Sequence, residues 1–268
     1  MSETTLVPES TIVILATCAT LCFIIPIIAL IAYKKNTGAK LKPVIYGFIM
    51  FLAFSMGVEQ IIHALVLVLD SPVSRFVAAH PFVYAIYGAC AAAVCEEFGR
   101  LIGFKLLKDD APDKKASVMY GIGHGGAECI IVGAFSLFSS LVYATLLNAG
   151  GYDAFILSGG EEYVAQMTNI ADTILNTNPP LFFVSVFERI VALTLQISLS
   201  FFVYKSVKEG NKKFFLIALG LHFIFDFFAA MYQIGIITNL IVEEVMLAVM
   251  TAAVAVFAVK VFKKTEEA

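Results

Sequence analysis

Charged residues are scarce in this sequence, and many patterns that mark secreted, disulfide-bonded or zinc-binding proteins are missing. Only 15% of the 268 residues are charged, whereas 60% are apolar and 24 are phenylalanines. Soluble domains average about a quarter charged residues and about half apolar residues. The composition therefore excludes an ordinary soluble globule. It predicts a polytopic membrane protein that lies in a lipid bilayer, and no nucleic-acid partner is expected.

No pattern for a disulfide framework or a cleaved leader is present. The five cysteines lie in apolar runs and form no CxxC pair, which is typical of small buried hydrophobic residues. The first residues lack the basic region of a signal peptide. The first apolar run is therefore expected to be retained as a helix.

Two frequent hydrolase signatures are also missing. The HExxH zinc motif does not occur, and no serine or cysteine stands at a useful spacing from a histidine. The second absence argues against a covalent acyl-enzyme. No cofactor is required by the sequence, but a Zn²⁺ site could still be assembled in three dimensions. Its candidate ligands are His124, Glu128 and His222.

Seven apolar runs reach the length of about 20 residues that a membrane-spanning helix needs. They cover residues 11–33, 44–69, 81–107, 118–147, 181–204, 214–234 and 240–262. We therefore predict an all-α bundle of about seven transmembrane helices, forming one polytopic membrane domain over residues 1–268.

Lysines mark alternate connectors. They group after the first, third, fifth and seventh runs, whereas the other connectors hold a single basic residue, Arg75. Basic connectors face the cytoplasm. The sequence thus predicts a multi-pass protein of the bacterial plasma membrane, with its N-terminus outside and its C-terminus cytoplasmic.

The long connector over residues 148–180 should lie outside. It is acidic, has no lysine or arginine, and contains glycine pairs and Pro179-Pro180. The apolar spacing in its middle suits a short amphipathic helix on the membrane surface. This interfacial helix could act as a lid or as a plain connector.

Ionisable residues inside the spans are few. A charge at membrane depth costs several kcal/mol, roughly 2.5–3.5 on insertion scales. The second, fourth and sixth runs each carry a histidine and a carboxylate four residues apart, so each pair lies on one helix face. These pairs are Glu59/His63, His124/Glu128 and His222/Asp226, and the third and fifth runs add Glu96, Glu97, Arg100, Glu188 and Arg189.

Depth along the helices sorts these residues into two groups. One group lies roughly 9–18 Å from the cytoplasmic helix ends, taking 1.5 Å per residue, and comprises Glu96, Glu97, Arg100, His124, Glu128, His222 and Asp226. These residues can meet at one level. The other group should form a supporting layer nearer the outer surface, in which Glu59 or Glu188 neutralises Arg189, with His63 close by.

The first group has the functional groups for hydrolysis. Two carboxylates and two histidines can deprotonate a water, protonate a leaving amine and stabilise an oxyanion. Four glycines between residues 121 and 126 would let another backbone or an extended substrate approach the fourth span closely. The alternatives are a proton-coupled transporter that uses the same groups as a relay, and a non-catalytic membrane scaffold.

Four motifs, in this order along the chain, resemble those of known membrane proteases. They are Glu96-Glu97-Phe98-Gly99-Arg100, Gly123-His124-Gly125-Gly126-Ala127-Glu128, Phe187-Glu188-Arg189-Ile190 and His222-Phe223-Ile224-Phe225-Asp226. The chain is similar to the glutamic-type intramembrane proteases, the superfamily of the CAAX prenyl endopeptidases, bacteriocin-processing proteins and PrsW. It resembles the YhfC family of bacterial membrane peptidases more closely.

The resemblance implies roles for these residues. Glu96 and His124 would activate water, and His222 with Asp226 would stabilise or position the oxyanion. Glu97 and Arg100 would be supporters, and Glu128 a further polar ligand.

Two departures from the family patterns stand out. Two residues, instead of three, separate the glutamate pair from Arg100. This spacing places Arg100 one helix turn from Glu96 and leaves open which carboxylate is the base. The chain also has Gln196 where the YhfC pattern leads us to expect a histidine.

The sequence therefore predicts an intramembrane endopeptidase. Its substrate would be a membrane protein or peptide. Water would be activated by Glu96 or Glu97 together with His124, in a site that opens toward the cytoplasmic leaflet.

Overall fold

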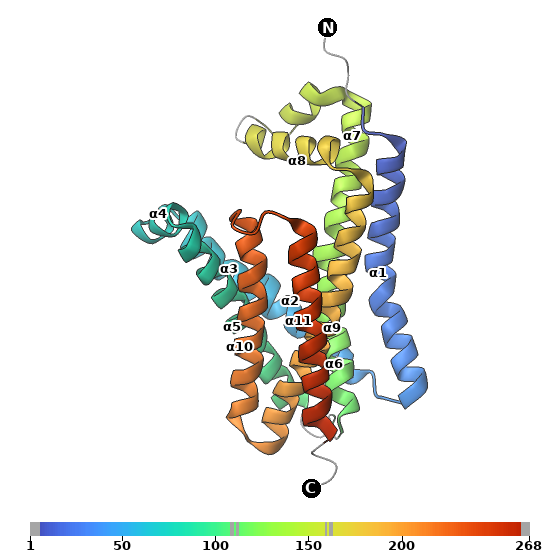
Figure 1. Ribbon diagram of the computed structural model, residues 1–268, viewed down its shortest axis with the longest axis vertical. Helices are drawn as coiled ribbons and strands as arrows, with labels where there is room; N and C mark the ends of the chain where they lie inside the picture. The colour runs from blue at the N-terminus through green and yellow to red at the C-terminus, as the bar shows by residue number, and fades with distance from the viewer. Residues whose placement is uncertain (1–5, 108–109, 111–112, 159, 161–162, 264–268) are drawn as a thin grey trace. The chain divides into compact units, whose positions relative to one another are not determined.

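The computed structural model describes residues 6–107, 110, 113–158, 160 and 163–263. Within these ranges every regular element is a helix, and seven helical segments are long and apolar enough to cross a membrane (Figure 1). They are Glu9–Thr37, Lys42–Val68, Pro81–Leu107, Lys115–Leu157, Pro179–Glu209, Lys212–Gln233 and Leu240–Val261. The predicted all-helical, multi-pass membrane fold is confirmed. The orientation of the termini stays a prediction.

The chain divides into two compact units. Unit 1 combines the chain up to Ile25 with Cys129–Ile190, and unit 2 combines Pro26–Glu128 with the chain from Val191 onward. That residues 1–268 act as one membrane domain stays a prediction.

Unit 1 is held together by apolar packing. Its core includes Leu15, Ala144 and Ala171, which are completely buried. Asn148 joins two of its segments, because its side chain donates to the carbonyl of Val7 (3.0 Å) and accepts from the Val7 amide (2.7 Å). The elements of unit 1 are the first part of α1 (Glu9–Thr37), η4 (Cys129–Ala134), α7 (Phe135–Leu157), α8 (Val164–Asn176), η6 (Pro179–Leu181) and the start of α9 (Phe182–Glu209).

The acidic connector of unit 1 is more helical than the sequence indicated. Helix α7 continues past the predicted end at residue 147 to Leu157, and its backbone breaks at Gly151, whose φ of 77° is left-handed. Glycine adopts this conformation without steric cost. Helix α8 covers most of the stretch predicted to be an amphipathic helix. Its place on a membrane surface stays a prediction.

Unit 2 contains helices that approach each other backbone to backbone. A Cβ atom added to Gly47 would lie 2.2 Å from the carbonyl oxygen of Tyr120, and one added to Gly123 would lie 2.1 Å from that of Val44. Only glycine fits at these crossings of α2 and α6, and the close approach expected at the fourth span is found. The elements are the rest of α1 and α9, α2 (Lys42–Ala53), η1 (Phe54–Glu59), α3 (Gln60–His63), η2 (Ala64–Val68), α4 (Pro72–Ala79), α5 (Pro81–Leu107), α6 (Lys115–Glu128), α10 (Lys212–Gln233) and α11 (Leu240–Lys263).

The second span is not a regular α-helix. Its segments η1 and η2 are π-helical and flank the short α3, so Glu59 ends one π-helical segment and His63 precedes the next. Short π-helical segments are rare and frequently occur at functional sites.

Candidate functional site

Three helices of unit 2 bring the first group of predicted residues together. Helix α5 contributes Glu96 and Glu97, α6 contributes His124, and α10 contributes His222. Glu96 is 7% exposed, and the other three side chains belong to residues exposed by 3% or less. Buried charges must find partners inside the protein. The residues predicted to meet from separate spans therefore do so.

One oxygen atom, Glu96 Oε2, lies at the centre of this cluster. It is 2.9 Å from His124 Nε2, 3.1 Å from Gln196 Nε2 and 3.6 Å from His222 Nε2. The ring of Phe51 packs edge-on against the His124 imidazole, with ring centroids 5.2 Å apart. Nitrogen atoms from three helices thus face one carboxylate oxygen.

The second glutamate orients the second histidine. Glu97 Oε1 lies 2.7 Å from His222 Nδ1, so the opposite ring nitrogen, Nε2, faces Glu96. A carboxylate on one imidazole nitrogen fixes the orientation and the tautomer of the ring. His222 Nε2 also lies 3.4 Å from Asp226 Oδ2. The pair predicted from a spacing of four residues is therefore in contact.

Arg100 follows the glutamates by about one turn on α5 and holds the cluster through several hydrogen bonds. Its NH1 group donates to the carbonyl of Gln196 (2.8 Å) and to the Ser200 hydroxyl (3.0 Å), and its NH2 group donates to Gln196 Oε1 (2.5 Å). The same NH2 group pairs with Glu97 Oε1 at 3.5 Å. The sequence placed Arg100 one turn from Glu96, but in the structure the ion pair joins Arg100 to Glu97. The spacing of residues along a helix determines on which face a side chain lies, but it does not determine which rotamer the side chain adopts.

Gln196 is the residue that sequence reasoning left without a role. Arg100 only donates, so the amide oxygen of Gln196 must face Arg100. The amide nitrogen is thereby turned to Glu96 Oε2 and to Glu128 Oε2, at 3.1 and 2.9 Å. The signal that could have indicated a role for Gln196 is that the family pattern leads us to expect a histidine at this position.

The pair on the second span forms a separate group beside the cluster. His63 Nε2 lies 3.3 Å from Glu59 Oε1, and His63 Nδ1 lies 2.9 Å from the Tyr87 hydroxyl. Glu59 is 7% exposed, and its Oε2 has no hydrogen-bond partner among the described residues. The sequence did not indicate Tyr87.

Glu188 and Arg189 belong to unit 1, where Arg189 donates to its chain neighbour Glu188. Of the two carboxylates suggested to neutralise Arg189, Glu188 does so. Glu59 pairs with His63.

The donor set of the cluster fits a zinc ion. Imidazole nitrogens and carboxylate oxygens bind Zn²⁺ at about 2.0–2.2 Å, which places neighbouring donors of a tetrahedron about 3.4 Å apart. His222 Nε2 lies 3.4 Å from Asp226 Oδ2 and 3.6 Å from Glu96 Oε2. Asp226 Oδ2 and His124 Nδ1 are buried without a hydrogen-bond partner among the described residues. As the side chains stand, no group of three His, Cys, Asp or Glu residues in the described ranges encloses an ion.

Charge balance also favours a cation here. Glu97 pairs with the guanidinium of Arg100, whereas Glu96 and Asp226 pair with histidines. Excess buried negative charge is costly unless protons or a cation offset it. A divalent ion between the imidazoles and Asp226 would supply that offset.

The fold and the cluster define a multi-pass membrane protein with a buried histidine–carboxylate centre. A model of the YhfC intramembrane metalloprotease family matches residues 21–247, which include every residue of the cluster. The chain therefore belongs to this family. At the family level it is a membrane protease, a hydrolase that acts on protein.

A curated relative agrees with this assignment. The chain is 30% identical over 247 residues to "Uncharacterized membrane protein YhfC" of Bacillus subtilis (strain 168), and the alignment covers 92% of this chain and 95% of the relative. No solved structure matches the chain.

Proposed function

We propose that the chain is an endopeptidase that hydrolyses a peptide bond of a membrane-embedded protein, with Glu96 as the general base. The observation that carries this proposal is the convergence of His124 Nε2, His222 Nε2 and Gln196 Nε2 on Glu96 Oε2, inside an apolar bundle. A buried carboxylate fixed in position by its neighbours can accept a proton from a water bound beside it.

We further propose that His124, His222 and Asp226 hold Zn²⁺ in the active enzyme. Two imidazoles and one carboxylate are a ligand set of zinc hydrolases. Bound zinc would act as a Lewis acid and make a water acidic near neutral pH. Glu128, the carboxylate expected from the sequence as a ligand, instead accepts a hydrogen bond from Gln196 in this structure.

The protein groups then divide the proton transfers. Glu96 takes a proton from the attacking water and returns it to the departing amine, which is the usual task of a general base that becomes a general acid. Glu97 keeps His222 turned toward the site, and Arg100 keeps Gln196 turned toward Glu96. Donors fixed before reaction stabilise developing charge without reorganising.

The same residues would serve a metal-free, glutamic-type mechanism of the CAAX protease superfamily. Glu96 and His124 would then activate water, while His222 and Asp226 stabilise the oxyanion. Metal analysis of the purified protein and exhaustive chelation separate the two routes. If chelation leaves peptide cleavage intact and the protein holds no metal, the zinc assignment is wrong and the glutamic route stands.

The test of the function is a screen of membrane peptides co-expressed with the wild type or with Glu96→Gln, followed by mass spectrometry of new peptide termini. We expect new termini with the wild type and none with Glu96→Gln. Glu209→Gln is the matched control, because Glu209 pairs with Lys205 away from the cluster. Cleavage by Glu96→Gln would overturn the base assignment. Proton or solute flux in proteoliposomes without any peptide product would favour the transporter.

A further inference from the structure

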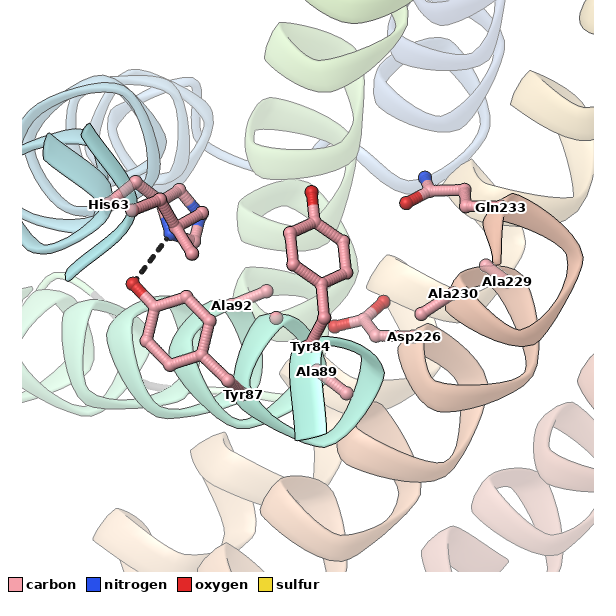
Figure 2. A pocket seen from close by; sticks show the side chains of 11 residues that line it. His63, Tyr84, Tyr87, Ala89, Ala92, Asp226, Ala229, Ala230 and Gln233 are labelled. Carbon is pink, nitrogen blue, oxygen red and sulfur yellow. Dashed lines mark hydrogen bonds between the residues drawn. The ribbon is translucent and has the colours of Figure 1, made fainter. Parts of the chain in front are cut away.

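A cavity of about 320 Å³ lies beside the cluster in unit 2 (Figure 2). Helix α5 forms its floor between Tyr84 and Ala92, the second span forms one wall with His63 and Leu67, and α10 forms the other wall between Asp226 and Gln233. The volume is near the lower end of the range of about 300–1,000 Å³ that is usual for ligand pockets. It has room for a short stretch of chain and not for a whole helix, whose diameter is about 10 Å.

Asp226 connects this cavity with the cluster. Its Oδ2 lies 3.4 Å from His222 Nε2, whereas the side chain as a whole is 32% exposed and lines the cavity. On the floor, Ala92 precedes Glu96 by one helical turn, about 6 Å along α5. A chain segment in the cavity would therefore lie next to the proposed reaction centre.

The walls carry hydrogen-bonding groups that the protein itself leaves unused. In the described part of the chain, no hydrogen bond forms to the Tyr84 hydroxyl or the Gln233 amide, and both line the cavity (Figure 2). The Tyr87 hydroxyl and His63, joined at 2.9 Å, line it from the other side. Tyr84 lies in the first turn of α5 and Gln233 ends α10, so these groups stand at the ends of the two helices that line the cavity.

Small residues cover the rest of the surface. Gly88, Ala89 and Ala92 on α5 face Ala229 and Ala230 on α10. A Cβ added to Gly88 would meet no atom within 4 Å. Short side chains on both sides let another backbone approach closely.

These features suit a substrate that spans the membrane. A peptide bond in a transmembrane helix is shielded by its helical hydrogen bonds, so it must unwind before water can reach it. Each N–H or C=O group freed inside the bilayer costs several kcal/mol unless it finds a partner. The cavity offers phenol, imidazole and amide partners above a floor of small residues, which lets a backbone of small residues approach closely.

We propose that this cavity binds an unwound stretch of a substrate's transmembrane segment, with small residues such as alanine, glycine or serine next to the cleaved bond. The segment lies between η2 and α10 and is held through its backbone by Tyr84, Tyr87 and Gln233. Asp226 marks the end nearest the reaction centre. The inference rests on the proposed protease function and adds the substrate class to it.

The cavity also shows on which side of the cluster a substrate would bind. It lies toward the start of α5 and the end of α10, away from Lys105 and from the lysine-rich connector between α9 and α10. The opening expected from the sequence was on the lysine-rich side. The helix depths located the cluster, but only packed side chains show where a cavity is left.

The test uses the full-length protein in proteoliposomes, with a photo-crosslinking residue in place of Leu67 in the cavity wall. The probe is a polyleucine transmembrane peptide with a central Ala-Gly-Ser-Gly stretch, compared with a peptide of leucine throughout. We expect roughly tenfold more crosslinking of the first peptide, a difference of about 1.4 kcal/mol. A crosslinker in place of Leu216, which is 61% exposed on α10 and lies outside the cavity lining, should not distinguish the peptides.

Two matched variants test the occupied space. Gly88→Leu fills the cavity and should lower crosslinking at position 67 to the level of the polyleucine peptide. Gly220→Leu on α10 is the control, because a Cβ there also meets no atom within 4 Å and Gly220 does not line the cavity. Equal crosslinking of both peptides, or no effect of Gly88→Leu, would overturn the proposal.

The same experiment keeps the two proposals apart. Crosslinking should persist in Glu96→Gln, because Glu96 does not line the cavity. Selective crosslinking without any peptide product in the wild type would contradict the protease function but support the assignment of the cavity. Peptide cleavage that Gly88→Leu does not slow would support the protease function and contradict the assignment of the cavity.

Discussion

The two units of this protein bury different kinds of side chain. Among the described residues, unit 1 buries only Thr11 and Arg189 as polar or charged residues, whereas unit 2 buries Glu96, Glu97 and His222 together with many more. Both units contain long apolar helices. Intramembrane charge is costly wherever it lies, so its concentration in one unit supports the proposal that the chemistry takes place there.

The two buried arginines show the same contrast. Arg100 is fully buried and is bound by Gln196 and Ser200 as well as Glu97. Arg189 pairs with the adjacent Glu188, whose side chain is 43% exposed. Arg100 joins residues of two helices, whereas the ion pair of Arg189 joins two neighbouring residues of one helix.

The largest expected effect tests whether chemistry is confined to unit 2. Glu96→Gln should lower the rate of peptide cleavage about 10²–10⁴-fold, the usual contribution of a general base, while the protein stays folded and inserted. Asp172→Asn in unit 1, where Asp172 accepts a hydrogen bond from Tyr152 (3.2 Å), should leave the rate near that of the wild type. Rates of product formation measure both effects. Equal losses of rate in the two variants would show that chemistry is not confined to unit 2.

The second effect concerns stability. Arg100→Met removes the only guanidinium from the cluster and leaves Glu97 and Gln196 without it, so we expect the free energy of unfolding to fall by about 3–5 kcal/mol. Arg189→Met removes an ion pair whose carboxylate partner is 43% exposed, so it should cost less than Arg100→Met. Denaturant unfolding in detergent micelles measures both. Similar losses for the two variants would show that the arginines play the same role.

A smaller effect is expected at the residue that orients His222. Glu97→Gln weakens the contact with His222 Nδ1 and should lower zinc affinity about 10–100-fold, as is usual for carboxylates that support a metal-bound histidine. Competition with a chelator, read by zinc analysis, measures the change. Unchanged affinity would mean that Glu97 serves only Arg100.

The smallest effect sharpens the role of Gln196. Gln196→Leu removes the amide between Glu96 and Glu128, and loss of a buried hydrogen bond costs about 1–3 kcal/mol. We expect cleavage to slow about tenfold, which corresponds to about 1.4 kcal/mol, toward the lower end of that range. Gln196→His, which restores a nitrogen donor, should recover most of the rate. If histidine is as poor as leucine, the amide has a role beyond donating a hydrogen bond.

The sequence was sufficient for the spans because long apolar runs have few alternatives in a membrane. The third run was predicted over 81–107, and α5 covers Pro81–Leu107. The boundary of the fourth run was wrong at its end, because Gly151 breaks α7 without ending it. Glycines and acidic residues indicated a loop there, but they do not exclude a kinked helix.

The cluster was predictable in outline and not in detail. Helix periodicity placed His222 and Asp226 on one face, and depth placed them level with Glu96. The partner of Arg100 and the bridging amide of Gln196 depend on rotamers and on helix rotation, which sequence spacing does not specify. The cavity beside Asp226 depends on the space that side chains of three helices leave between them.

The π-helical segments of the second span have one further consequence. A π-helical turn contains one residue more than an α-helical turn, so deleting Gly57 from η1 would restore ordinary winding without interrupting the helix. Because the wider turn already absorbs that residue, the residues after the deletion would keep their faces, and His63 would stay beside Tyr87. In the α-helical α5, deleting one residue would instead rotate every later residue by about 100°. The second span therefore tolerates a change of length that the third span does not.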